Sequence, residues 1–163
     1  MRRLIFKLSL LILITLTTHP IEATERTVIK INLYEMSFQI EGQDSKSPLI
    51  LKSGQDYKLI FENLGKMKHE VLLGRGVEGE NPQEYSENLF NNFKIAVSGS
   101  IVTNQEKKIW VVETNGLDEI ELDPGLRLAL FFRLPESVKG QWELGCFMPG
   151  HFQMGMRLPL IVE

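Results

Sequence analysis

Three residues near the C-terminus have side chains that together could bind a metal ion. Cys146, His151 and Met156 lie in the run GCFMPGHFQMGM, where four residues separate each from the next. A thiolate, an imidazole and a thioether are the ligand types of a mononuclear type 1 copper site. Such a site also needs a second imidazole, and His69 is the only other histidine after residue 23. These four residues are therefore the candidate ligands.

The elements expected around these residues would bring them to one end of a sheet structure. Cys146 ends an alternating run and shares its face with Trp142 and Leu144. Met156 begins the next alternating run, and His69 opens another apolar run. The shared face directs the Cys146 sulfur into apolar surroundings, where a thiolate is stable only beside a cation. The pattern thus favours a bound metal over an empty site.

Other interpretations of the same residues are simpler. A single cysteine is often a small core residue, and a single histidine or methionine is often structural. Zinc is an alternative metal, although the soft ligand set selects copper. A Cys146–His151 nucleophile would need an orienting third group, and the sequence offers no motif for one. A site filled by protein ligands leaves no place for a small-molecule substrate, so we expect no enzyme activity.

The body of the chain has the period-2 pattern of β-strands. Turn residues separate the runs, as at Asn115-Gly116 and Asp123-Pro124-Gly125. Seven or eight short strands at this spacing predict an all-β fold, an antiparallel sandwich or barrel. The predicted strand runs are 29–33, 36–40, 57–61, 69–73, 108–113, 126–132, 142–146 and 156–160.

One segment departs from this alternation. Asn81 is a good helix N-cap and is followed by proline, a residue favoured at the first helical position. Large apolar side chains then recur every four residues from Tyr85 onward. The spacing predicts a short amphipathic helix over 82–92, inside a long connection of about 74–107.

Residues 1–23 have the layout of a secretory signal peptide. A basic start precedes an apolar stretch, and a small residue, Ala23, ends the segment at a plausible cleavage point. We therefore expect an exported protein whose single domain spans 24–163, and an uncleaved N-terminal membrane anchor is the alternative.

Composition excludes several classes of protein. The chain has 163 residues, a formal net charge of −3 and no cluster of Lys and Arg in its body, so we expect no nucleic-acid partner. The single cysteine excludes an internal disulfide, a cysteine-based zinc framework and a four-cysteine iron–sulfur site.

The ligand run, the upstream KHEVLLG and the closing LPLIVE together resemble the cupredoxin family, closest to its periplasmic plastocyanin- and azurin-like copper proteins. The resemblance implies a Greek-key β-sandwich that binds one copper ion and shuttles between Cu(I) and Cu(II). It implies His69, Cys146 and His151 as equatorial ligands and Met156 as the weak axial ligand.

The resemblance also implies a role. It predicts a monomeric one-electron carrier of the periplasm that meets a redox partner protein. From the residues themselves, we expect Phe147, Met148 and Phe152 to keep water off the metal and to leave an apolar collar around the edge of His151, suited to such a partner. Copper delivery or tolerance is the alternative function, and a metal-free interaction module is a third. Met148 and Met154 remain rival axial ligands. Glu70 departs from the small polar residue that the family often has after the first histidine, and we expect it to point away from the site.

Overall fold

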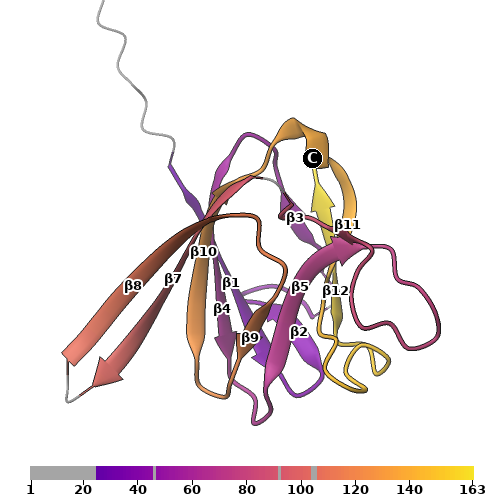
Figure 1. Cartoon of the computed structure of the whole chain (residues 1–163), viewed down its shortest axis with the longest axis horizontal. Helices are drawn as coiled ribbons and strands as arrows, with labels where there is room; N and C mark the ends of the chain where they lie inside the picture. Colours follow the sequence, from indigo (N-terminus) through magenta and orange to yellow (C-terminus); the bar gives the residue numbers. More distant parts are fainter. Residues whose placement is uncertain (1–24, 46, 92, 104–105) are drawn as a thin grey trace, which may run out of the picture.

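The computed structural model describes residues 25–163 except 46, 92 and 104–105, and leaves the side chains of 101–108 undescribed. The described chain forms a β-sandwich with one short 3-10 turn, η1 (Glu136–Val138) (Figure 1). The strands are β1 (Thr27–Tyr34), β2 (Ser37–Ile40), β3 (Leu49–Leu51), β4 (Asp56–Asn63), β5 (His69–Arg75), β6 (Glu87–Asn88), β7 (Lys94–Thr103), β8 (Glu106–Asn115), β9 (Ile120–Leu122), β10 (Arg127–Arg133), β11 (Gly140–Gly145) and β12 (Arg157–Val162).

Two sheets form the sandwich. Sheet A has the strand order β2-β1-β4-β10-β7-β8, and sheet B has the order β3-β12-β11-β5-β6, with β9 paired to β5. The chain crosses repeatedly between the two sheets, for example where β4 leads to β5 and where β10 leads to β11. The predicted all-β sandwich is confirmed. The pairing is not purely antiparallel, however, because β1 lies parallel to β4 and β3 parallel to β12.

The core lies between the two sheets and follows the alternation seen in the sequence. Each strand turns every second side chain inward, so apolar residues at those positions leave water together. Buried side chains from sheet A include Ile31, Leu33, Leu59, Phe61, Leu130 and Phe132, and those from sheet B include Val71, Leu73, Trp142, Leu144, Leu158 and Leu160.

The predicted helix over 82–92 is wrong. The backbone there bonds across to β5 and to the residue after it instead of to itself: Leu89 donates to the Leu73 carbonyl, and Ser86 donates to the Gly76 carbonyl, both at 2.8 Å. β6 forms between these two bonds. Tyr85 and Leu89 are buried as the four-residue spacing suggested, but in separate clusters on the two sides of this strand-like segment.

The predicted long connection over 74–107 is also wrong in its second half, where β7 lies. β7 has the sequence KIAVSGSIVT, and glycine and serine interrupt its apolar alternation. Gly99 is needed there because the ring of Trp110, its partner on β8, occupies the space of a side chain: a Cβ at Gly99 would lie 2.4 Å from that ring. The glycine that accommodates this ring, with the serines beside it, interrupts the alternation from which a strand would have been predicted.

The predicted signal peptide, residues 1–23, lies outside the described residues. Among the residues that are described, none forms a helix of the length and apolarity needed to cross a membrane.

Candidate metal centre

His69 is the first residue of β5, and the buried Asn63 holds the turn that precedes it. The Asn63 side-chain amide donates to the carbonyls of Met67 and Leu122, each at 2.8 Å. These bonds tie the turn between β4 and β5 to β9, which pairs with His69 at Leu122. The strand start predicted for His69 is confirmed, and its side chain is fully buried.

The other candidate ligands lie in the loop between β11 and β12, here called the ligand loop (146–156). Its ends meet, because the Cys146 amide donates to the Met156 carbonyl at 3.2 Å. The loop then folds onto itself: Met156 donates to the His151 carbonyl and His151 to the Met148 carbonyl, both at 2.9 Å. These backbone bonds hold the ligand loop over the end of sheet B.

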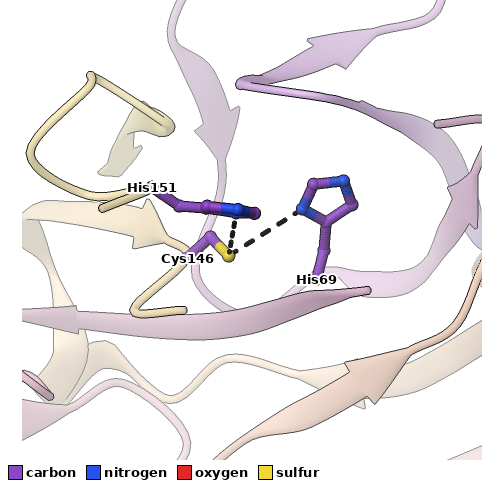
Figure 2. Close-up of side chains that lie close together, drawn as sticks. All are labelled: His69, Cys146 and His151. Atoms are coloured by element: carbon purple, nitrogen blue, oxygen red, sulfur yellow. Dashed lines mark hydrogen bonds between the residues drawn. The ribbon is translucent and has the colours of Figure 1, made fainter. Parts of the chain in front are cut away.

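Figure 2 shows the side chains of His69, Cys146 and His151 pointing toward one another. The Cys146 Sγ lies 3.3 Å from His151 Nδ1 and 4.0 Å from His69 Nδ1. The potential ligand atoms of the three residues all lie within 4.8 Å of one another, and all three residues are buried. The structure thus brings together the thiol and both imidazoles that the sequence singled out.

These spacings suit a metal ion. Bonds of about 2.3 Å to a thiolate and about 2.0 Å to an imidazole, about 120° apart, require the sulfur and nitrogen to be about 3.7 Å apart. The two observed sulfur–nitrogen distances, 3.3 and 4.0 Å, lie on either side of that value. The set of one sulfur and two imidazole nitrogens also matches the softness that copper prefers.

Without a cation, the buried thiol remains protonated. Burial raises the pKa of the Cys146 thiol, while backbone N–H groups of Glu70 and Met148 lower that pKa in part. The Glu70 amide reaches the sulfur at 3.4 Å. Donors directed at sulfur stabilise a thiolate, and a metal ion would supply the remaining stabilisation.

Both imidazoles are disposed to be neutral, the form that binds metals. Burial lowers the pKa of His69; the neighbouring His151 lowers it further, and Glu35 raises it. Burial also lowers the pKa of His151. The His69 Nε2 atom is buried and has no hydrogen-bond partner among the described residues. The ring is therefore positioned by its packing, with Nδ1 facing the Cys146 sulfur.

A cluster of aromatic rings supports the ligand loop from behind. Phe147 and Phe152 stack with ring centroids 4.5 Å apart, and Tyr85 meets both rings edge-on. The Tyr85 hydroxyl donates to the Glu143 carboxylate at 3.0 Å, and the same carboxylate accepts from Arg157 at 3.0 Å. Phe147 and Phe152 are therefore buried, in a cluster separate from the core that contains Cys146, and they do not form the exposed collar expected around His151.

Sequence reasoning missed Tyr85 as part of this site. Its four-residue spacing from Leu89 placed it on the face of a helix that does not exist. The signal that could have identified it is Gly145, immediately before the cysteine: a Cβ there would lie 2.4 Å from the Tyr85 hydroxyl oxygen. A glycine inside a strand often marks such a close approach.

The three candidate methionines differ in burial. Met156 is fully buried, Met148 is partly buried against the main core, and Met154 is 67% exposed. Glu70 pairs with Glu121 across to β9, on the face opposite His69 and Leu122. Glu70 thus points away from the three clustered ligands, as expected.

No protein-family model matches the sequence, and no curated protein matches it. Solved structures do match. Rusticyanin from Thiobacillus ferrooxidans is 16% identical with a TM-score of 0.52, over 85% of this chain and 77% of rusticyanin. Auracyanin A from Chloroflexus aurantiacus, described as a "blue" copper protein, is 18% identical with a TM-score of 0.50, over 85% of this chain and all of auracyanin A.

A multicopper oxidase from Campylobacter jejuni is 20% identical with a TM-score of 0.52. The match covers 89% of this chain but only 31% of the oxidase. These likenesses show that the chain has the cupredoxin fold.

Proposed function

We propose that this protein of cupredoxin fold binds one copper ion at His69, Cys146, His151 and Met156 and carries single electrons. The observation that carries the proposal is the buried cluster of one thiol and two imidazoles, whose ligand atoms lie within 4.8 Å of one another. Copper bound there would supply a one-electron couple between Cu(II) and Cu(I).

Each of the four proposed ligands has a defined part. Cys146 provides the thiolate, held by backbone amides of Glu70 and Met148. His69 and His151 provide neutral imidazoles, and Met156 provides a buried thioether as the axial ligand. Because the ligand loop and β5 are fixed by backbone hydrogen bonds, these side chains can keep one arrangement in both oxidation states.

His151 is the ligand nearest to solvent, with 7% of its surface exposed, whereas His69 and Cys146 have none. An electron would therefore leave or enter through the edge of His151. We infer that the partner is a redox protein that contacts the ligand loop, in the periplasm, the compartment for which the signal-peptide layout of residues 1–23 argues.

Copper delivery is the second candidate function. The exposed thioether of Met154 favours it, because thioethers bind Cu(I) and this one is open to an acceptor. Delivery requires that Cu(I) leave the protein, while electron transfer requires that it stay.

The test is a visible absorption titration of the mature protein with Cu(II). We expect an intense sulfur-to-copper band that saturates at one equivalent. Reduction with ascorbate should bleach the band, and reoxidation should restore it without loss of copper. Transfer of Cu(I) to a chelating acceptor during that cycle would favour delivery instead.

Cys146→Ser is the decisive variant, because it removes the thiolate but leaves the other ligands. Its band should be absent in protein that circular dichroism shows to be folded. A retained band would contradict the ligand assignment, and no band in folded, reduced, zinc-free wild-type protein would overturn the copper proposal.

A further inference from the structure

The outer edge of sheet A ends in a long strand with an unusual surface. β8 pairs with β7 on one side and terminates the strand order of the sheet (Figure 1). Four successive residues of β8 are exposed and apolar: Ile109 (71%), Trp110 (39%), Val111 (61%) and Val112 (55%). Because successive side chains alternate between faces, both faces of this edge are apolar.

Such an edge is a template for pairing with another strand. Its outer N–H and C=O groups have no strand partner in the described part of the chain. Natural edge strands are usually protected by a central charge, a proline or a bulge. In β8 the charges lie at the two ends of the apolar run: Lys107 and Lys108 precede it and Glu113 follows it.

We propose that β8 pairs antiparallel with β8 of a second copy of this chain, which joins two sandwiches through one continuous sheet. A two-fold axis through an antiparallel pair must place one residue opposite its own copy. An axis at Trp110 sets Ile109 opposite Val111, and Lys107 opposite Glu113. Residues 109 to 111 then face one another, and opposite charges lie across from each other at both ends of the pair.

Neighbouring registers are poorer. An axis at Val111 would set Ile109 opposite Glu113, and an axis at Ile109 would set Trp110 opposite Lys108 and Val111 opposite Lys107. Neither register sets residues of opposite charge across from each other. The register about Trp110 also sets Lys108 opposite an apolar residue, Val112, but it alone of the three pairs Lys107 with Glu113.

This pairing leaves the candidate metal centre open. The ligands come from β5 and the ligand loop of sheet B, whereas β8 lies on the far edge of sheet A (Figure 1). Each copy would therefore keep its His151 edge available. The monomer implied by the family resemblance would be replaced by a two-fold dimer with two independent centres.

The first test measures the molar mass of the mature protein by light scattering after size exclusion, up to about 1 mM protein. We expect twice the monomer mass. Val111→Lys should yield monomers without loss of stability, because the position is 61% exposed. Ile50→Lys is the matched control, an exposed apolar residue on β3 at the edge of sheet B, and it should remain dimeric.

Charge reversal tests the register itself. Glu113→Lys and Lys107→Glu each set like charges opposite one another in a homodimer, so each variant alone should be monomeric. An equal mixture of the two variants should dimerise, because every 107–113 pair then joins opposite charges. A monomeric wild type, or a dimer that Val111→Lys leaves intact, would overturn the pairing, and a mixture that stays monomeric would overturn the Trp110 register.

Discussion

At the scale of single residues, the thiol of Cys146 is the group that most needs a bound cation. It is fully buried, and its surroundings raise its pKa despite two backbone amides directed at the sulfur. Backbone amides directed at sulfur stabilise a negatively charged thiolate much more than a neutral core thiol. The neutral imidazoles of His69 and His151 would supply two further metal-binding nitrogen atoms without adding charge.

Met156 is the proposed axial ligand and is fully buried. Met156→Leu should leave copper bound but raise the reduction potential by at least about 60 mV, which is a tenfold change for a one-electron couple. The reason is that a soft donor to Cu(II) is lost while the three stronger ligands remain. Cyclic voltammetry of the copper-loaded variants measures the shift.

Met154→Leu is the control, because Met154 is 67% exposed and lies outside the core. Its potential should equal that of the wild type. A shift in Met154→Leu with none in Met156→Leu would mean that the axial methionine has been misassigned.

At the scale of elements, the contact between Tyr85 and Gly145 couples the β5–β7 connection to the ligand loop. Gly145→Ala should destabilise the protein by about 1–3 kcal/mol, as overpacking does. The added methyl group would lie 2.4 Å from the Tyr85 hydroxyl and displace it from Glu143. Denaturant unfolding of the metal-free protein gives the free energy of unfolding.

Tyr85→Phe provides the matched comparison. Alone it should cost about 1–2 kcal/mol, because it removes a hydrogen bond to a carboxylate. Combined with Gly145→Ala it should cost less than the sum of the two, because the colliding oxygen is gone. Strict additivity of the two changes would mean that the hydroxyl does not make this contact.

A cross-strand ion pair gives a prediction for the pH dependence of stability. Arg133 on β10 donates two hydrogen bonds to Asp56 on β4, at 2.6 and 3.0 Å. These bonds and the positive charge hold the pKa of Asp56 below its usual value of 3.8. As the pH falls, the unfolded state therefore binds a proton before the folded state does. The ion pair stabilises the fold at neutral pH, and this stabilisation is lost as the pH falls below 3.8.

Asp56→Asn should lower the Tm slightly at pH 7, because the pair is largely exposed. The difference from the wild type should shrink as the pH falls below 3.8. Thermal unfolding from pH 7 to pH 2 measures it. Arg133→Gln should show the same pH profile, and a difference that grows with acid would contradict the role of the pair.

The sequence was sufficient to predict the sandwich and the clustering of His69, Cys146 and His151, because both depend on strong local signals. The period of two defines the strands, and the only cysteine lies five residues before one of the few histidines. The helix over 82–92 failed because hydrogen bonds from Ser86 and Leu89 to β5 outweigh the local four-residue spacing. Parallel pairs such as β3–β12 could not be predicted, because they join segments far apart in the chain.

At the scale of the whole molecule, metal binding should contribute directly to the stability of the sandwich. A metal at a hundred times its dissociation constant adds about 2.7 kcal/mol, or about 10 °C in Tm for a domain of this size. Removal of copper with a chelator should lower the Tm by that order in differential scanning calorimetry. Cys146→Ser should show no such difference, and an equal shift in that variant would locate the stabilising metal elsewhere.

Because His69 and Cys146 are far apart in the chain, the metal centre would be a spectroscopic probe of folding. They are 77 positions apart, whereas His151 follows Cys146 by five. The nearby pair can meet early in an unstructured chain, but the distant histidine arrives only after β5 has paired with β11, and such long-range pairing is slow. A colour change that requires His69 would therefore mark, in a stopped-flow record, the moment at which the sandwich closes.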